Sequence, residues 1–321
     1  MNLNEYKYGV AIQCMTYNHA KYISDTLNGF STQITDFPFI AIIVDDASTD
    51  KEQDVIQDYL SRVFDASSCI REETNDFIRV IARHKTNVNC TFLVLFLKYN
   101  HYKKKAKRPY FKKWQDEAKY IALCEGDDYW TDPMKLSRQV KVMEEHPEYS
   151  MCAENGYWLD VRTNEISLFS SNPEKDISFE DLLIRRQFPT ASVLYRSTLS
   201  SAIAQLPKQS MDTAIWACLA KLGTVHYLPT ISSVYRRGDG ITEKDRIKWA
   251  YSVRRFNKSL YKTFDVPDYI KSIRDKDVAQ NLKKGVKEAK YKKQYVDMFR
   301  LTLYYIETLS KIRIRRFSSF L

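Results

Sequence analysis

Three carboxylates stand close together after one apolar run of the 321-residue sequence. Residues 119–124, KYIALC, are followed directly by Glu125, Gly126, Asp127 and Asp128. Carboxylates at the end of a buried strand repel one another, and a divalent cation is the simplest way to neutralise them. Glycine lets the backbone approach a ligand, and hard oxygen ligands suit Mg²⁺ or Mn²⁺ holding a diphosphate. The alternative is a helix N-terminus that carries acidic residues, which the helix dipole tolerates.

A second acidic group follows another apolar run, in the segment VDDASTD at residues 44–50. Adjacent residues at a strand end point to opposite sides, so either Asp45 or Asp46 can face a crevice while the other faces the protein. An aspartate in that crevice can accept a hydrogen bond from the N–H of a nucleobase. Ser48 and Asp50 are equally suited to capping the next helix.

The segments around these groups alternate between strand and helix patterns. Continuous apolar runs predict buried strands, and apolar residues three or four apart predict amphipathic helices. Strand, polar turn and helix in repetition are typical of a parallel sheet with crossover helices, which binds ligands at the carboxyl ends of its strands. The predicted strands are 8–16, 39–44, 77–82, 119–124 and 149–153; the predicted helices cover 22–30, 55–60 and 136–146, with a further one beginning at Ser178.

One basic run, KKKAKR at residues 103–108, lies between the third and fourth predicted strands, within residues 87–119. We interpret it as a solvated helix end or loop, and contact with a phosphate or an acceptor is the alternative.

Composition allows one large α/β domain with an appendage, since 44% of the residues are hydrophobic. No run of 18 apolar residues appears, and the first residues, MNLNEYKYG, do not resemble a signal peptide, so we expect a cytoplasmic protein. The six cysteines have no metal-ligand spacing, which favours free thiols in a reducing compartment. The five histidines share no ligand spacing either, and none is predicted to bind a metal.

The net charge of +10 is concentrated at the C-terminus. Residues 241–321 hold 21 Lys and Arg against 9 Asp and Glu, while the preceding residues carry a net charge of −2. This part shows almost no strand pattern, and we predict two to four helices broken at Pro267 and Gly285. Apolar residues at helical spacing near Lys and Arg are compatible with contact to the inner face of an anionic membrane, and packing on the preceding domain or on a partner subunit is the alternative.

Taken together, residues 8–242 resemble a family 2 glycosyltransferase of the GT-A fold. The resemblance rests on four motifs in the family's order: the first strand ending in Thr16 and Asn18, then VDDASTD, then EGDDYWTDPMKL at residues 125–136, and finally Asp212 followed by the Tyr-Arg pair at 235–236. It implies a Rossmann-like, mostly parallel sheet flanked by helices. The expected domains are a catalytic domain at 1–240, with a donor half at 1–130 and an acceptor half at 131–240, and a basic helical extension at 241–321.

The resemblance also implies how a nucleotide-sugar donor is bound. Thr16 and Asn18 would border the nucleotide pocket, and Asp45 would contact the base, commonly uracil. Asp127 would bind Mn²⁺ or Mg²⁺ and Asp128 would support it.

Two departures from the family pattern bear on the donor. Glu125 stands where the family's Asp-x-Asp motif begins with aspartate, in a place that contacts the sugar or ribose. Relatives often carry a histidine two residues after the Tyr-Arg arginine, where this chain has Gly238. Arg236 or Arg237 would instead supply positive charge to the leaving diphosphate.

The implied reaction is an inverting single displacement in which Asp212 takes the proton of the acceptor hydroxyl. Capping of the following helix is the other role open to Asp212. Trp130, Thr190 and Ser192 would lie on the acceptor side, although residues 188–193 equally suit a plain edge strand. The acceptor would be a glycan or a lipid-linked sugar of surface polysaccharide synthesis.

Two other function classes remain open. A nucleotidyltransferase also uses Mg²⁺ and paired acids, but the chain has no glycine-rich, basic phosphate loop near its start. A non-catalytic protein that binds nucleic acid or membrane would explain the basic tail, yet the acidic clusters would repel nucleic-acid phosphates and no recognition motif is present. We therefore expect no nucleic-acid partner.

Overall fold

A computed structural model describes residues 5–101, 107–207, 211–238 and 245–318, with side chains to residue 315. The chain divides into two compact units, which are described separately. The first joins residues 1–177, 188–201 and 222–236; the second joins residues 178–187, 202–221 and 237–321. The second unit thus combines two short earlier stretches with the C-terminal extension. The functional boundaries expected at residues 130 and 240 stay predictions.

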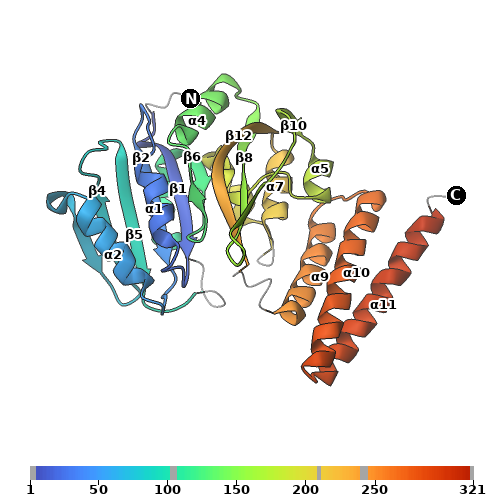
Figure 1. Ribbon diagram of the computed structural model, residues 1–321. Helices are drawn as coiled ribbons and strands as arrows, with labels where there is room; N and C mark the ends of the chain where they lie inside the picture. The colour runs from blue at the N-terminus through green and yellow to red at the C-terminus, as the bar shows by residue number, and fades with distance from the viewer. Residues whose placement is uncertain (1–4, 102–106, 208–210, 239–244, 319–321) are drawn as a thin grey trace. The chain divides into compact units, whose positions relative to one another are not determined.

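The first unit is built on one twelve-stranded sheet (Figure 1). Its main path has the order β10-β12-β8-β11-β6-β1-β2-β5-β4-β3, with β7 paired to β12 and β9 to β8. The strands are β1 Tyr8–Thr16, β2 Phe39–Asp45, β3 Ile70–Glu73, β4 Phe77–Arg83, β5 Cys90–Leu97, β6 Ala118–Leu123, β7 Tyr129–Trp130, β8 Tyr149–Asp160, β9 Glu165–Leu168, β10 Lys175–Ile177, β11 Leu194–Arg196 and β12 Thr224–Arg237.

The central strands β6, β1, β2 and β5 are parallel, and the strands on both flanks are antiparallel. The predicted α/β fold class is therefore confirmed, with its parallel part confined to the centre. Thr16 pairs with Asp45, and Gln13 pairs with Leu123, so β1, β2 and β6 end at one edge. The expected convergence of the acidic and polar turns on that edge is confirmed.

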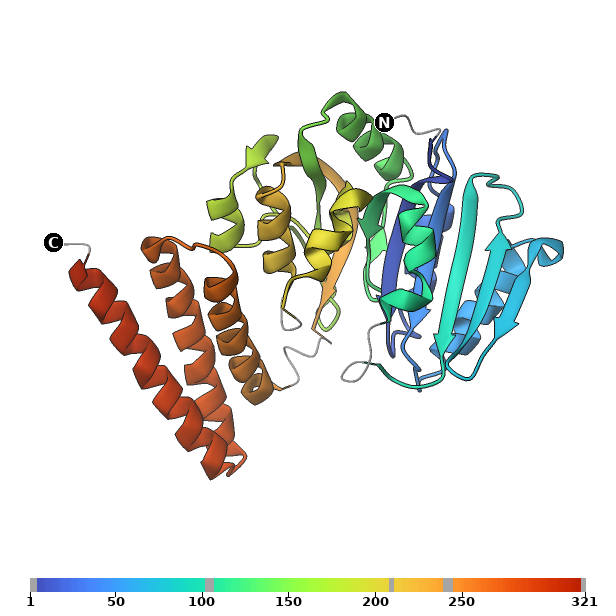
Figure 2. The same cartoon turned by 180° about the vertical axis from the view of Figure 1, so that it is seen from behind.

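Helices cover both faces of this sheet. One side chain in two along β1, β2 and β5 enters a core with α1 Ile23–Ser31, α2 Glu52–Val63 and α4 Lys135–Glu145. Figure 1 shows α1 and α2 in front of the strands, and Figure 2, the view from behind, shows α3 Lys112–Asp116 on the opposite face. The helices predicted at 22–30, 55–60 and 136–146 are confirmed as α1, α2 and α4, whereas α3 was not predicted.

One central strand was absent from the expected elements. Within residues 87–119 we interpreted only the basic run at 103–108, as a loop or a solvated helix end, and predicted no strand. Residues 90–97, CTFLVLFL, form β5 and are almost entirely buried. A strand covered on both faces is a nearly continuous apolar run. Residues 90–97 have this pattern and were missed because the segment was interpreted from its basic run. The predicted strand at 77–82 is present as β4, although it runs antiparallel to β5.

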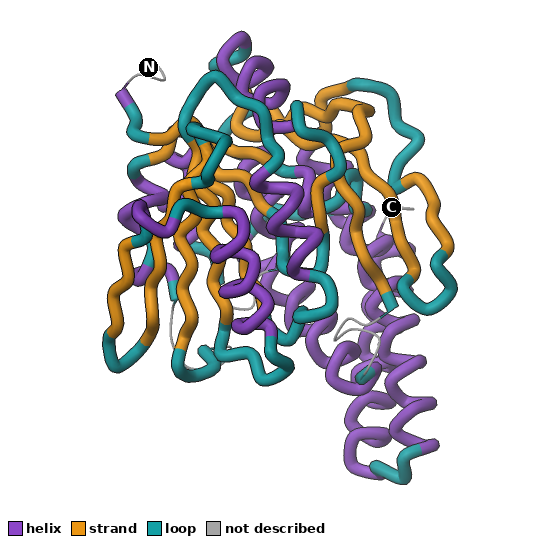
Figure 3. Tube along the Cα trace, turned by 60° about the vertical axis from the view of Figure 1, so that its left-hand side comes forward, coloured by secondary structure: helices purple, strands orange, loops and turns teal. Residues whose placement is uncertain are grey.

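The second unit is helical. Its short helices are α5 Phe179–Ile184, most of α6 Ser200–Ala204, and α7 Asp212–Ala220; its long helices are α9 Arg246–Thr263, α10 Asp268–Tyr291 and α11 Tyr295–Ser318. Figure 3 shows the last three as helices joined by short turns. As predicted, the Ser178 hydroxyl caps α5 by accepting from the Asp181 N–H, and Pro267 lies at the start of α10.

The predicted break at Gly285 is wrong, because this glycine lies in the middle of α10. A Cβ at this position would lie 2.9 Å from the Ala250 Cβ and 3.1 Å from a Leu301 methyl group. Glycine here permits close packing of α10 against α9 and α11 rather than ending a helix.

All six cysteines are free. Cys14, Cys90, Cys124 and Cys152 are buried, whereas Cys69 is exposed. Within the described ranges, no helix combines the length and the apolar character needed to cross a membrane.

Candidate functional site

The loops after β1, β2 and β6 are joined by backbone hydrogen bonds at the carboxyl edge of the sheet. The Asp46 N–H donates to the Thr16 carbonyl at 3.0 Å, and the Gly126 N–H donates to the Met15 carbonyl at 3.0 Å. The β1 loop therefore lies between the two acidic segments and is fixed to both.

A buried glutamate at the start of α2, Glu52, organises these loops. Its carboxylate accepts hydrogen bonds from the Thr16 hydroxyl, from the His19 N–H at 2.8 Å and from the Ser48 hydroxyl at 2.8 Å. Burial raises the Glu52 pKa, while these three donors act in the opposite direction. The sequence analysis did not identify Glu52. The sequence showed only an acidic residue in the first turn of a helix, a few residues after Asp45 and Asp46.

Three non-glycine residues of the same loops adopt left-handed backbone conformations. They are Asn18, Ala47 and Lys51, with φ of 59°, 60° and 71°. The Asn18 side-chain oxygen accepts from the Thr49 N–H at 2.8 Å, and the Asn18 backbone N–H donates to the Ser48 hydroxyl at 2.9 Å. Such conformations persist only where surrounding contacts impose them, and they concentrate at binding sites.

Asp45, the last residue of β2, has one carboxylate oxygen without a partner. Its Oδ2 accepts from the Ser48 N–H at 3.3 Å and from the Gln53 side chain. Its Oδ1 is buried and has no hydrogen-bond partner among the described residues. Burial is the largest influence on this carboxyl and raises its pKa. A buried acceptor of this kind is costly unless a ligand donates to it.

The neighbouring aspartate has a different role. Asp46 is buried and accepts from the His101 N–H at 2.7 Å, and the Lys107 ammonium lies 2.6 Å from its other oxygen. Lys107, from the basic run, thus pairs with a carboxylate of the sheet edge. Residues 103–106 of that run lie outside the described residues.

The two aspartates after β6 also differ from each other. Asp128 is buried and accepts from the Arg236 backbone N–H at 2.8 Å. Desolvation, reinforced by the nearby charges of Asp127 and Glu125, raises the Asp128 pKa well above its ordinary value. The Asp127 side chain is 36% exposed, and its carboxylate lies 3.8 Å from Nε2 of His19. Of the two, Asp127 is the carboxylate that a ligand can reach.

Arg236 holds this acidic turn in place from β12. Its side chain is 9% exposed, donates to the Asp127 carbonyl at 2.9 Å and forms an ion pair with Asp25. The guanidinium also lies 4.8 Å from the ring centre of Tyr22 and 4.4 Å from that of Tyr129. Arg236 is therefore committed to the protein, whereas the next residue, Arg237, is exposed.

Glycine is the only residue type that fits at position 126. A Cβ there would lie 2.0 Å from the Thr16 hydroxyl oxygen and 2.5 Å from the Thr16 Cβ. The close approach of two loops, rather than an unusual backbone conformation, is what requires glycine.

The residues expected on the acceptor side are buried in this structure. Trp130 is 4% exposed and its indole N–H donates to the Ala191 carbonyl at 2.6 Å. Ser192 has no exposed surface, and its hydroxyl donates to the Pro189 carbonyl at 2.8 Å. Thr190 is 9% exposed and lies in a short 3-10 turn rather than in an edge strand. The hydrogen bonds of Trp130 and Ser192 hold the turn that precedes β11.

Asp212 is the first residue of α7, in the second unit. Met211 occupies the capping position and makes no side-chain cap, so Asp212 is not the residue that caps the helix. Its carboxylate is 41% exposed and lies 3.7 Å from the Arg186 guanidinium.

Comparison with known proteins decides the family. The model of Glycosyl transferase family 2 matches residues 14–196, more than half of the chain. The chain belongs to glycosyltransferase family 2. The β1, β2 and β6 loops that build the site all lie within the matched range, so the family assignment covers the acidic edge itself.

Several proteins resemble this family 2 chain. An uncharacterized protein of Mycobacterium tuberculosis, found identically matched in Mycobacterium bovis, is 33% identical over 231 residues, which is 71% of this chain and 58% of the relative. The chain thus spans less than two thirds of those relatives. The putative teichuronic acid biosynthesis glycosyltransferase TuaG of Bacillus subtilis is 26% identical over 68% of this chain and 74% of its own length.

Two solved glycosyltransferase structures share the fold. Residues 1–349 of S. aureus TarS in complex with UDP align with a TM-score of 0.52 and 16% identity, covering 83% of this chain and 70% of that one. The mannosyltransferase PcManGT of Pyrobaculum calidifontis, in complex with GDP-Man and Mn²⁺, aligns with a TM-score of 0.52 and 13% identity, covering 96% and 87%. At these identities the likeness establishes the GT-A fold.

The donor set for a metal in this family 2 chain is small. Among the described residues, no group of three or more His, Cys, Asp and Glu side chains is placed to hold an ion. Asp127 and, at 3.8 Å from it, His19 offer an exposed carboxylate and an imidazole. Such a site fits an Mg²⁺ or Mn²⁺ ion that takes its remaining oxygen ligands from a diphosphate and water.

Proposed function

We propose that this protein is an inverting, metal-dependent glycosyltransferase that moves a sugar from a nucleoside-diphosphate sugar to a hydroxyl of a glycan or lipid-linked acceptor. The observation that carries the proposal is the pairing of two unlike carboxylates at one sheet edge. Asp45 Oδ1 is buried and accepts no hydrogen bond from the described residues, and Asp127 has an exposed carboxylate beside His19. The first suits a nucleobase and the second a metal diphosphate.

The proposed donor is a UDP-sugar, although guanine and thymine nucleotides also carry one ring N–H. Uracil carries one ring N–H, and Asp45 Oδ1 is one buried acceptor without a partner among the described residues. Thr16 and Asn18 position the loop that borders this pocket, through Glu52 and Thr49. The UDP bound to TarS agrees with this choice, and the GDP-Man bound to PcManGT makes a guanine donor the alternative to test.

The metal, when bound, would neutralise the diphosphate and make it a good leaving group. Asp127 would hold it, with Glu125 turned to the sugar or ribose. Asp128 is buried and bonded to the Arg236 backbone, so it would fix the turn rather than bind the ion. Arg236 would act in the same way, through the Asp127 carbonyl. Arg237, the next residue, is exposed and would supply positive charge to the departing phosphates.

In the proposed reaction the acceptor oxygen forms a bond to the anomeric carbon as the bond from that carbon to the diphosphate breaks. The acceptor proton passes to the Asp212 carboxylate, and the nucleoside diphosphate leaves with the bonding electron pair. One displacement inverts the configuration, and no covalent enzyme intermediate forms. The Arg186 guanidinium, 3.7 Å away, would hold the Asp212 carboxylate in position.

The acceptor is proposed to belong to surface polysaccharide synthesis, in keeping with the name of the TuaG relative. Contact with an anionic membrane would bring a lipid-linked acceptor near, and α11 offers a surface for it. Val296, Phe299, Leu303 and Ile306 are 65%, 64%, 49% and 58% exposed and recur at helical spacing. Apolar side chains on a basic helix are typical of interfacial membrane binding.

Donor binding is tested by thermal shift with UDP-, GDP- and dTDP-sugars, with Mn²⁺, with Mg²⁺ and with chelator. A donor at about 100 times its Kd stabilises the fold by about 2.7 kcal/mol, a shift of several degrees. We expect one nucleotide class to give this shift with metal, and Asp127→Ala to abolish it. Asp36→Ala is the matched control, because Asp36 is exposed in the loop before β2, at the opposite end of the strand. A wild type that no nucleotide stabilises would refute the donor site.

The catalytic base is tested separately. Asp212→Asn is expected to keep the donor-induced shift and to lose sugar transfer by about two to four orders of magnitude, the usual contribution of a general base. Loss of the donor shift together with transfer would show that Asp212 has a binding or structural role instead.

A further inference from the structure

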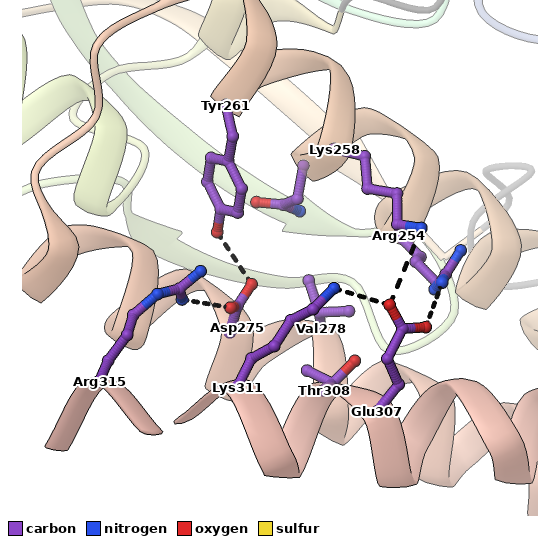
Figure 4. A pocket seen from close by; sticks show the side chains of 10 residues that line it. Arg254, Lys258, Tyr261, Asp275, Val278, Glu307, Thr308, Lys311 and Arg315 are labelled. Carbon is purple, nitrogen blue, oxygen red and sulfur yellow. Dashed lines mark hydrogen bonds and ion pairs between the residues drawn. The ribbon is translucent and has the colours of Figure 1, made fainter. Parts of the chain in front are cut away.

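A small cavity lies among the three long helices of the second unit. Figure 4 shows its side chains converging from α9, α10 and α11. Its volume is about 100 Å³, room for roughly three water molecules at about 30 Å³ each, and so far too small for a nucleotide. Six charged side chains line it: Arg254, Lys258, Asp275, Glu307, Lys311 and Arg315.

Three cations surround a single carboxylate on one side of the cavity. Glu307 lies 2.5 Å from the Arg254 guanidinium, 2.6 Å from the Lys311 ammonium and 4.0 Å from the Lys258 ammonium. The Arg254 guanidinium also lies 3.7 Å from the ring centre of Tyr304, which holds it in place. One negative charge thus faces three positive charges.

The other side of the cavity is balanced. Arg315 pairs with Asp275 at 2.5 Å, and the Tyr261 hydroxyl donates to the same carboxylate at 3.0 Å. The six lining charges therefore leave a surplus of two positive charges, all of it near Glu307. The surplus marks a place where an anion would gain from charge-assisted hydrogen bonds.

The titration of the lining groups agrees with this imbalance. Hydrogen bonding to Lys311 and Arg254 lowers the Glu307 pKa to about 2. This carboxylate is therefore ionised and already paired with both cations. Burial and the neighbouring charges of Arg254, Lys311 and Lys262 lower the Lys258 pKa, although Glu307 acts in the opposite direction. Around Lys258, neighbouring cations thus outnumber the one carboxylate.

We propose that this cavity binds a phosphate group, as a phosphomonoester or diphosphate. Its cations would be Arg254, Lys258 and Lys311, and its size admits one tetrahedral oxyanion with bound water. Lys258 and Lys311 are half-exposed, so the group enters from the surface while its carrier remains outside. The same chemistry is offered by a soluble phosphate compound and by the headgroup of a lipid.

Binding is measured on the full chain by calorimetry with inorganic phosphate and pyrophosphate, in chelator and in the Asp127→Ala background. That background removes any contribution of the proposed donor site, so failure here and failure of the donor proposal are distinguishable. The second source is tested with vesicles of phosphatidylcholine containing phosphatidic acid, against vesicles containing phosphatidylglycerol at equal charge. Preference for phosphatidic acid identifies a phosphomonoester lipid, and binding of the soluble anions alone identifies a soluble ligand.

Two kinds of variant give opposite results if the proposal holds. Lys258→Gln with Lys311→Gln weakens binding by about a hundredfold, about tenfold for each charged donor lost. The matched control, Lys284→Gln with Lys287→Gln, removes two exposed lysines of α10 outside the cavity and leaves binding unchanged. Glu307→Gln removes the competing carboxylate and tightens binding by about fivefold or more.

The Glu307→Gln result separates an anion site from a network that only joins helices. In a purely structural network this variant loses helix contacts and shows no gain in anion affinity. The proposal is overturned if the wild type binds neither the two inorganic anions nor phosphatidic acid vesicles. Equal affinities for the cavity pair and the control pair of lysine variants would overturn it as well. Should Glu307→Gln fail to fold, the half-exposed Lys258→Gln alone still decides the question.

Discussion

The role of Glu52 can be tested by two substitutions with different expected costs. Glu52→Ala removes the acceptor of three hydrogen bonds from Thr16, His19 and Ser48, in a place with no exposed surface. Hydrogen bonds to a charged group contribute about 1.5 to 3 kcal/mol each, and such losses are not additive. We expect a loss of about 3 to 5 kcal/mol in the free energy of unfolding. Glu52→Gln keeps one oxygen acceptor in place, and its expected cost at neutral pH is about 1 kcal/mol or less.

The pH dependence gives the sharper result. Because burial raises the Glu52 pKa above 4.5, the folded chain holds this proton at pH values where the unfolded chain has released it. The contribution of Glu52 to stability therefore falls as the pH rises above 4.5. Glutamine does not ionise, so the stability of Glu52→Gln relative to wild type should increase from pH 4.5 toward neutrality. Urea unfolding at a series of pH values measures this difference.

Either of two outcomes would refute this reasoning. One is a difference between Glu52→Gln and wild type that stays constant from about pH 4 to pH 8. The other is a Glu52→Ala variant that unfolds within about 1 kcal/mol of wild type. A correct account also requires Glu52→Ala to lose the donor-induced thermal shift, since the loop that borders the proposed nucleotide pocket would no longer be held.

Three further predictions concern the packing of the first unit. Gly126→Ala forces the added methyl group against Thr16, 2.0 Å from its hydroxyl oxygen, and should cost about 1 to 3 kcal/mol in urea unfolding and weaken donor binding; unchanged stability would contradict the close approach. Lys135 is fully buried and its pKa is lowered to about 8, so wild type should gain up to about 3 kcal/mol over Lys135→Met as the pH rises from about 8 to about 10.5, measured as a difference in unfolding free energy. Arg236→Lys cannot reproduce the planar contacts of the guanidinium, and we expect a loss of about 1 to 3 kcal/mol and weaker Mn²⁺-dependent donor binding through Asp127, with an unaltered metal titration as the contrary result.

The parts of the fold that could be predicted from sequence are those with a local signal. Strands β1, β2 and β6 are short apolar runs that end in polar turns, and α1 and α2 carry apolar residues at helical spacing. β5 is a mainly apolar run. It was missed because the segment that contains it was interpreted from the basic residues at 103–108. The flanking antiparallel strands depend on pairing between residues far apart in sequence, such as Ser233 with Trp130, for which a single sequence contains no register signal.

The candidate site divides in the same way. Asp45 and Asp127 are acidic residues at strand ends, and their types and positions indicated a function before their surroundings were known. Glu52 and Arg236 act largely through partners distant in sequence. Two of the three donors to Glu52 lie 33 and 36 residues away, and the side-chain partners of Arg236 lie 109 and 211 residues away. Their importance lies in which groups they contact, which only the fold determines. Trp130 was expected at an acceptor surface because it is an aromatic residue next to an acidic motif, and the fold shows that its side chain is buried.

The electrostatics of the site connect its stability to its proposed ligands. Burial raises the pKa of Asp45, of Glu52 and of Asp128, so one edge of the sheet holds three carboxyl groups whose ionised forms are unfavourable. Glu52 and Asp128 are compensated by donors of the protein itself, but one oxygen of Asp45 is not. A ligand that donates a hydrogen bond to Asp45 and brings a cation to Asp127 would relieve both the unmet acceptor and the repulsion between the acids. One ligand that carries both a base and a metal-bound diphosphate would make both contacts, which is why a site of this composition should favour the two joined over either part alone.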